Sequence, residues 1–366
     1  MKLSVGIVGL PNVGKSTLFN ALTEKSVPAE NYPFCTIDPA VGIVAVPDNR
    51  LNTLTKISNS TKTVPAVVEF VDIAGLVKGA SSGEGLGNQF LSHIKDVDMI
   101  AHVLRIFDDT ELHHVAGVVN PLEDMSVINL ELILSDHQTV TKRKDNLERD
   151  VKRGDTVAKE MYVLCEKIIT QLENEKLVLD LDFNEREKEL LKNFQLLTMK
   201  PMLYVVNKKY DSYNIDENND ERWLELKQHW KDNNMQYVIV DAGIEAELAS
   251  LSTEEKNEFR REYGAQDSGI DELIKCTYNK LGLTSFFTTG EKETRAWTIK
   301  RGDSAPDAGA TIHNDFKDKF IRAQVISFTD LVQAGSVVSA RDNGKMRTEG
   351  KEYIVQDGDV IEFLHG

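Results

Sequence analysis

The chain has 366 residues, of which 41% are hydrophobic and 28% are charged, and its formal net charge is −16. This length suits about two or three globular domains, and no apolar run approaches the roughly 20 residues of a membrane span. The negative charge argues against a protein that attracts nucleic acid over its whole surface.

Strand and helix patterns alternate along the first hundred residues and again after residue 200. Apolar, β-rich runs predict strands at residues 3–8, 41–46, 67–71, 99–106, 202–206 and 237–240. Helical patterns lie at residues 15–23, 86–95, 222–232 and 270–281. This order predicts βαβ units and a largely parallel sheet that is covered on both faces.

The first predicted strand leads into the glycine-rich sequence GLPNVGKS at residues 9–16. It fits G-x-x-x-x-G-K-[ST] and lies between a strand and a helix, as this phosphate-binding loop requires. Backbone N–H groups of such a loop face phosphate oxygens, with Lys15 reaching the β- and γ-phosphates and Ser16 binding Mg²⁺. The predicted nucleotide contacts here are Gly9, Pro11, Asn12, Val13, Gly14, Lys15, Ser16 and Thr17.

Residues downstream of this loop are expected to complete a site for Mg²⁺ and the γ-phosphate. Asp72 and Gly75 form a D-x-x-G sequence behind a predicted strand, and Thr36 lies in the preceding loop. We expect Asp72 and Thr36 to support Mg²⁺ and the Gly75 N–H to sense the γ-phosphate. Leu76 stands where many GTPases place a water-orienting glutamine, which predicts slow basal turnover. His114, in a later loop, is the candidate catalytic residue; a monovalent cation or a bound partner is the alternative.

Residues 127–194 contain almost no Gly or Pro, and apolar positions there recur at helical spacing. They include Leu130, Leu132 and Leu134, followed by Val157, Met161, Leu164, Ile168 and Leu172. We predict two antiparallel helices joined near residues 179–184, forming a coiled-coil hairpin inserted into the α/β domain. Basic residues cluster at 142–153, and two interpretations stay open: a solvated helix face with i,i+4 ion pairs, or an RNA-contacting face.

The strand predicted at residues 202–206 ends in the sequence Asn-Lys-Lys-Tyr. Asn207 and Lys208 match the N-K-x-D pattern of guanine-specific proteins, but Tyr210 replaces the carboxylate that accepts two hydrogen bonds from guanine. We therefore favour ATP over GTP. After the next strand, Ala242 and Gly243 are expected to offer backbone N–H groups to the base.

The C-terminal part changes to short β-type runs separated by turns. Strands are predicted at residues 295–299, 320–326, 352–355 and 360–364, with one helix at 307–313. We therefore divide the chain into a nucleotide-binding domain at 1–126 and 199–282, a helical insertion at 127–198 and a small α+β module at 283–366. Three cysteines without paired or metal-type spacing, and an N-terminus that runs directly into the first motif, predict a cytoplasmic protein.

The order of these motifs resembles the YchF family of Obg-related P-loop NTPases, also called Obg-like ATPases. The matching stretches are GLPNVGKSTLFNAL (9–22), YPFCTIDP (32–39), DIAGLVKGASSGEGLGNQF (72–90), IEAEL (244–248), GEKETRAWTIKR (290–301) and GKEYIVQDGDVIEF (350–363). The resemblance implies a P-loop G domain with an inserted coiled-coil hairpin and a C-terminal β-grasp-like TGS module.

The resemblance also implies a Mg²⁺-dependent ATPase that binds the ribosome, in particular its large subunit, and RNA, and that regulates translation or the stress response. We expect the protein to be a monomer. Asn12 then indicates either activation by potassium or a hydrogen bond that shapes the loop, and His114 corresponds to the family's catalytic loop histidine. The family usually carries N-x-x-E, from which Tyr210 departs. Two alternatives stay open: an Obg-style guanine-nucleotide switch, and a non-catalytic scaffold that binds RNA or protein and is stabilised by nucleotide.

Overall fold

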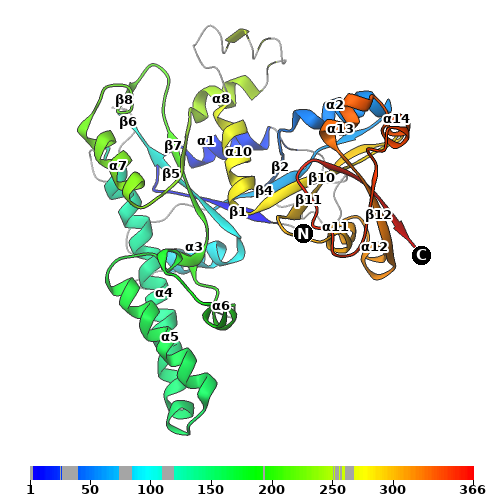
Figure 1. Ribbon diagram of the computed structural model, residues 1–366. Coiled ribbons are helices and arrows are strands. Elements are labelled where there is room, and N and C mark those ends of the chain that lie inside the picture. Colours follow the sequence, from blue (N-terminus) through cyan, green and yellow to red (C-terminus); the bar gives the residue numbers. More distant parts are fainter. Residues whose placement is uncertain are drawn as a thin grey trace. The chain divides into compact units, whose positions relative to one another are not determined.

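The computed structural model describes most of the chain (Figure 1). Described are residues 3–24, 26, 40–73, 85–108, 119–192, 194–249, 251, 255, 258–259 and 268–366, without the side chains of 85–89 and 249. The chain forms two compact units. Unit 1 comprises Met1–Leu3, Lys25–Glu69 and Ile270–Gly366, and unit 2 comprises Ser4–Glu24 and Phe70–Gly269. The domain boundaries at residues 126, 198 and 282 remain a prediction from the sequence.

Unit 2 contains a parallel sheet built from the predicted apolar runs. Neighbouring strands pair in the order β1 (Ser4–Val8), β5 (Met99–Arg105), β7 (Met202–Asn207) and β9 (Tyr237–Val240). Every residue of β5 and β7 is buried, as expected for strands covered on both faces. The accompanying helices are α1 (Lys15–Thr23), α3 (Gly85–Asp96), α7 (Glu221–Asp232) and α8 (Ala242–Ala249). The predicted α/β class is confirmed.

Strand β4 (Val67–Asp72) begins in unit 1 and ends in unit 2. Directly after it, the Ile73 N–H donates to the Ile7 carbonyl at 3.3 Å, so this end of β4 lies beside β1. Ligands of α/β sheets bind at the carboxyl ends of parallel strands. Asp72 and the loop that follows β1 therefore come to the same edge of the sheet.

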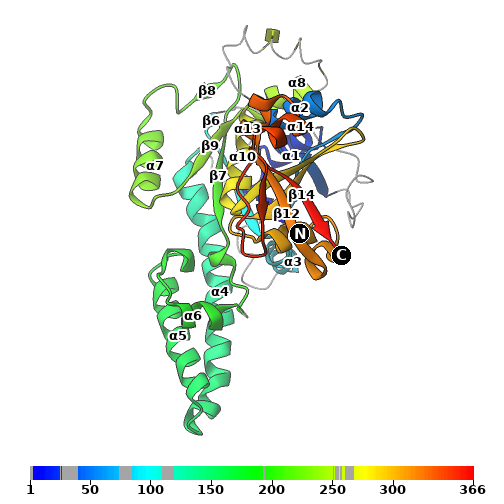
Figure 2. The ribbon, with the colours of Figure 1, turned by 45° about the vertical axis from the view of Figure 1, so that its right-hand side comes forward.

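A helical hairpin consists of α4 (Pro121–Lys152) and α5 (Thr156–Glu173), which lie side by side in Figures 1 and 2. The hairpin prediction is confirmed, but the connection predicted at residues 179–184 is wrong. The chain turns at Gly154, whose φ of 89° is left-handed, and Asp155 caps α5 by accepting the Ala158 N–H at 2.9 Å. The signal for this turn is a single Gly-Asp pair within a long charged run.

The predicted apolar stripe is only partly buried. Leu164, Ile168 and Leu172 are buried, as is Leu132, whereas Leu130, Leu134 and Val157 are exposed by 43%, 40% and 47%. Beyond α5 lie a short helix, α6 (Glu185–Leu191), and two 3-10 turns, η3 (Val178–Asp180) and η4 (Leu197–Met199). None of the described helices has the length and hydropathy to cross a membrane.

The buried carboxylate of Asp136 connects α4 to η4. One oxygen accepts the Leu197 N–H at 3.0 Å, and the other accepts the Thr198 N–H at 2.7 Å and its hydroxyl at 2.6 Å. Burial raises the pKa of Asp136, and these hydrogen bonds oppose that rise. Since the side chain is only 2% exposed, these three donors are what satisfies it away from water.

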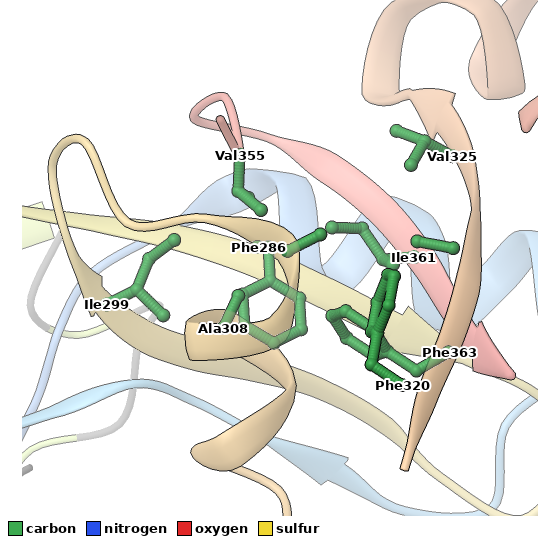
Figure 3. Close-up of a cluster of buried hydrophobic side chains, with 10 residues drawn as sticks. Phe286, Ile299, Ala308, Phe320, Val325, Val355, Ile361 and Phe363 are labelled. Carbon is green, nitrogen blue, oxygen red and sulfur yellow. The ribbon is translucent and has the colours of Figure 1, made fainter. Parts of the chain in front are cut away.

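The sheet of unit 1 combines segments far apart in sequence. Its strand order is β13 (Arg347–Glu349), β12 (Phe320–Ser327), β14 (Asp359–His365), β10 (Leu283–Thr289), β11 (Thr294–Lys300) and β3 (Thr63–Val64). Its core gathers the rings of Phe286, Phe320 and Phe363 (Figure 3). The helices of this unit are α2 (Asn49–Ser58), α10 (Gly269–Lys280), α11 (Ala305–Ala310), α12 (Asn314–Asp318), α13 (Phe328–Ala334) and α14 (Val337–Asp342); β2 (Val41–Ala45) also belongs to it.

Two of the C-terminal predictions are wrong. The strand predicted at residues 352–355 is a loop with one isolated bridge, between Ser304 and Ile354. The helix predicted at 307–313 is replaced by two shorter helices, because Ser304 and His313 each cap a new start. The sequence patterns also missed α2 and β10.

Candidate nucleotide-binding site

The loop between β1 and α1 has the curled backbone that the glycine pattern predicts. Asn12 and Gly14 have left-handed φ values of 63° and 94°. A Cβ atom on Gly9 would lie 2.6 Å from the Val103 carbonyl, and one on Gly14 would lie 2.1 Å from the Asn207 amide nitrogen. Both positions therefore exclude side chains, so the loop can follow the end of the sheet closely.

Lys15 lies inside this loop. Its ammonium group donates to the Gly9 carbonyl at 2.9 Å and the Leu10 carbonyl at 2.8 Å, and the side chain is 9% exposed. Burial lowers the pKa of Lys15, and nearby Asp72 opposes that shift. Burial likewise raises the pKa of Asp72, against the effect of Lys15. A phosphate group would supply the negative charge that this partly desolvated ammonium lacks.

Asn207 joins this loop to the segment after β9. Its amide nitrogen donates to the Val13 carbonyl at 2.9 Å, and its amide oxygen accepts the Ala242 N–H at 3.1 Å. The side chain is 4% exposed. Ala242 thus has an acceptor within the protein, and Gly243 is the other residue predicted to face the base.

The turn after Asn207 is fixed by other side chains. Asn214 accepts the Lys209 N–H at 3.0 Å and donates to the Lys209 carbonyl at 2.9 Å. It belongs to β8 (Tyr213–Asn214), which pairs with β6 (Phe107–Asp108). Lys208 forms an ion pair with Glu217 at 3.2 Å. The β6–β8 pair therefore fixes the loop that follows Asn207, where the sequence predicts the contact with the base.

A hollow of about 390 Å³ lies at this edge of the sheet, within the range of small-molecule pockets. It is lined by Asn12, Gly14, Lys15, Ser16, Thr17, Phe107, Asn207, Lys208, Lys209, Asp241, Ala242 and Gly243. Most of the predicted nucleotide contacts are thus brought together. The predicted contacts Gly9, Pro11 and Val13 belong to the same loop without lining the hollow.

Sequence reasoning missed Asp241, a carboxylate in this lining. One oxygen accepts the Tyr210 N–H at 2.6 Å, and the other accepts the Ile244 N–H at 3.0 Å at the start of α8. Tyr210 itself is 53% exposed. The available signal was an aspartate between a strand and a helical pattern, which is a preferred helix N-cap.

His102 is a second group that the motifs did not reveal. It pairs in register with Val8, directly before the phosphate-binding loop, and is fully buried. Neither ring nitrogen has a hydrogen-bond partner in the described structure. Burial, assisted by the charge of Lys15, lowers the pKa of His102 to about 3. The ring is therefore neutral at physiological pH.

The donors for a divalent cation fit Mg²⁺ in chemistry. Ser16 is exposed at the start of α1, and Asp72 ends β4 near Lys15. The described residues contain no cluster of three His, Cys, Asp or Glu side chains. A magnesium site that uses one hydroxyl, one carboxylate, phosphate oxygens and waters needs no such cluster. The predicted residues Thr36, Gly75 and His114 lie outside the described residues, as does Leu76.

Comparison with known proteins identifies relatives over the full length. A family model described as a 50S ribosome-binding GTPase matches residues 4–135, and the model YchF-GTPase_C, described as a protein of unknown function, matches residues 283–365. The chain is 50% identical to the "Ribosome-binding ATPase YchF" of Bacillus subtilis (strain 168), over 99% of both sequences. It is 46% identical to the protein of the same name from Escherichia coli O157:H7, over 100% of this chain and 99% of that one.

A solved structure agrees with these relatives. The structure of the Schizosaccharomyces pombe YchF GTPase is 37% identical in sequence and has a TM-score of 0.88. The alignment covers 99% of this chain and 98% of that one. Similarity of this extent includes the phosphate-binding loop, the helical hairpin and the C-terminal sheet together, and on that basis the chain belongs to the YchF family.

Proposed function

We propose that this chain is a ribosome-binding ATPase that hydrolyses ATP with Mg²⁺ and regulates translation or the stress response. The observation that carries the proposal is the hollow at the end of the parallel sheet, where Lys15 and the curled loop meet the segments held by Asn207. The names of its relatives, "Ribosome-binding ATPase YchF", support the ATPase activity and the ribosome as partner.

In this proposal, Lys15 exchanges its two carbonyl acceptors for oxygens of the β- and γ-phosphates. Ser16, Asp72 and Thr36 would hold Mg²⁺, which would neutralise phosphate charge, and the Gly75 N–H would contact the γ-phosphate. His114 would position the attacking water, with potassium near Asn12 as an activator. Because Leu76 cannot orient water, basal turnover is slow.

The base preference follows from the acceptor missing at Tyr210. Its N–H is held by Asp241, and its side chain projects as an exposed phenol. A phenol cannot accept the two hydrogen bonds that guanine offers, so ATP is favoured. One observation supports a second candidate, an Obg-style GTP switch: Asp241 places a carboxylate in the hollow, and each of its oxygens keeps a lone pair beyond its backbone donor.

Calorimetry with non-hydrolysable ATP and GTP analogues, in Mg²⁺ and potassium, tests the nucleotide assignment. We expect tighter binding of the ATP analogue, and at least about 100-fold weaker binding in Lys15→Ala because the phosphate charge loses its partner. Lys351→Ala, an exposed lysine in the C-terminal module, is the matched control and should bind normally. Preference for the GTP analogue would establish the second candidate, whereas binding of neither would leave a non-catalytic scaffold.

Co-sedimentation with separated ribosomal subunits tests the partner. We extend the proposal to the large subunit, to RNA and to a cytoplasmic monomer. Three basic residues of the hairpin cluster form ion pairs, Lys144 with Glu166, Lys152 with Glu148 and Arg153 with Asp150, and these pairs favour the solvated helix face over the RNA-contacting face. A partner-free turnover on the order of tens per second would contradict the slow basal rate.

A further inference from the structure

The segment of residues 48–64 belongs to the nucleotide-binding half of the sequence but packs with the C-terminal module. It contains α2 and β3, and β3 pairs in parallel with β11 through Thr63 with Thr294 and Val64 with Arg295. Val64 is only 2% exposed. This stretch, which we term the bracing segment, therefore completes the C-terminal sheet within unit 1.

Arg50 anchors one end of the bracing segment. Its Nη1 and Nη2 donate to the two oxygens of Asp357 at 2.7 and 3.2 Å. Its Nε and Nη2 donate to Asp48 at 2.9 and 2.8 Å. The guanidinium also lies over the Phe287 ring, 5.2 Å from its centroid. Because a planar guanidinium binds both carboxylates at once, it fixes the orientation of Asp48 and Asp357 as well as the distance between them.

The loop around Asp357 is shaped to receive this arginine. Asp357 also accepts the Thr284 hydroxyl at 2.9 Å and the Ser285 N–H at 3.3 Å. Gly358 has a φ of 90°, and a Cβ there would lie 2.8 Å from Arg50 Nη1. Asp357 thereby connects the bracing segment to β10 and to the turn before β14.

The other end of the bracing segment is bonded to the β10–β11 hairpin. The Ser60 hydroxyl donates to the Gly290 carbonyl at 2.6 Å. The Thr61 N–H donates to the Glu291 carbonyl at 2.9 Å, and its hydroxyl donates to the Lys292 carbonyl at 2.9 Å. Both ends of the bracing segment are thus bonded to the C-terminal module.

The chain leads from these contacts to the nucleotide site in a few residues. β3 ends at Val64, β4 begins at Val67, and β4 ends at Asp72, whose carboxylate interacts with Lys15. Because β3 and β4 are both paired in sheets and only two residues separate them, the chain between them has little slack. A charged nucleotide bound beside Lys15 and Asp72 therefore acts on β4, and β4 is joined directly to the bracing segment.

We propose that the bracing segment couples nucleotide occupancy to the C-terminal module, with the Arg50–Asp357 pair as the link that sets the coupling. The inference rests on the proposed function in one respect, because it requires nucleotide to bind beside Lys15. Coupling of this kind is reciprocal, so a partner bound to the C-terminal module changes nucleotide affinity by the same factor.

Amide hydrogen exchange on the full-length protein, with and without a non-hydrolysable ATP analogue, tests the coupling. In the wild type, we expect the analogue to slow exchange about 5-fold or more in peptides from β10 and from the turn at residues 356–358. Arg50→Met retains a long side chain but removes the fork, so the analogue should bind with unchanged affinity while this protection disappears. Asp357→Asn weakens the same ion pair by removing the charge of its C-terminal partner, and it remains informative if Arg50→Met fails to fold.

Lys317→Met is the matched control, because Lys317 forms an exposed ion pair with Asp307 at 2.7 Å in the same module, on α11 and α12. It should preserve the nucleotide-dependent protection. Binding of the analogue without protection of these peptides in the wild type, or protection that survives in both Arg50→Met and Asp357→Asn, would overturn the coupling alone. Absence of analogue binding in calorimetry would overturn both the coupling and the proposed function.

Discussion

Asn207 is the residue on which two loops of the nucleotide site depend. Removing its amide in Asn207→Ala leaves the Val13 carbonyl and the Ala242 N–H without their partner inside the protein. We expect a loss of about 1–3 kcal/mol in the free energy of unfolding and at least about 10-fold weaker binding of the ATP analogue. Urea denaturation and calorimetry measure the two effects. Asn343→Ala, on the surface of the C-terminal module, should change neither.

His102 should make stability depend on pH. Its pKa of about 3 in the folded protein lies below the ordinary value, so the unfolded chain takes up the proton more readily. Its contribution is therefore fully present well above pH 6.5 and is lost progressively as the pH falls through that value, by about 1.4 kcal/mol at pH 5.5. Urea denaturation at about pH 7.5 and 5.5 checks this, and His102→Phe should show a smaller decrease. An equal decrease in both proteins would contradict the assignment.

At the scale of residues, the sequence revealed groups whose spacing is imposed by phosphate chemistry. Gly9, Gly14 and Lys15 follow from the loop motif, because close backbone approach and a reachable ammonium leave few other arrangements. His102 and Asp241 could not be found in this way. Their importance depends on register and on loop contacts between strands distant in sequence, which single-chain patterns do not encode.

At the scale of elements, Asp136 holds the chain that returns from the hairpin. Asp136→Ala would leave three donors from Leu197 and Thr198 without their buried acceptor. We expect a loss of about 3 kcal/mol in the free energy of unfolding, measured in urea. Asp150→Ala provides the control, because its ion pair with Arg153 is exposed and should contribute less than about 0.5 kcal/mol. Similar losses in the two variants would show that burial of Asp136 matters little.

The elements that the sequence predicted well are long or strongly periodic, and the failures share a cause. The hairpin turn at Gly154 was missed because it directly follows the charged run at residues 142–153 and no cluster of turn residues marks it. β3 has only two residues, and its strand conformation depends on pairing with β11 rather than on local pattern. α2 is capped by Asp48, yet most of its residues are polar, so helical periodicity was weak.

At the scale of the molecule, the C-terminal module depends on the first part of the chain. A fragment of residues 283–366 would lack β3 and the Arg50 contacts, leaving an edge of β11 open. We expect this fragment to be cleaved by a nonspecific protease at least about 10-fold faster than the same region in the full-length protein. Mass spectrometry of timed digests gives both rates. Equal rates would show that the module is complete without the bracing segment.

The pairing of β3 with β11 also sets an order of events during synthesis. Thr63 leaves the ribosome about 230 residues before Thr294, the residue with which it pairs. At 5–20 residues per second, β3 waits roughly 10 to 50 seconds for its neighbour, which is far longer than a helix or hairpin takes to form. A nascent chain can therefore assemble the parallel strands of unit 2 early, while unit 1 is completed only when translation is nearly finished.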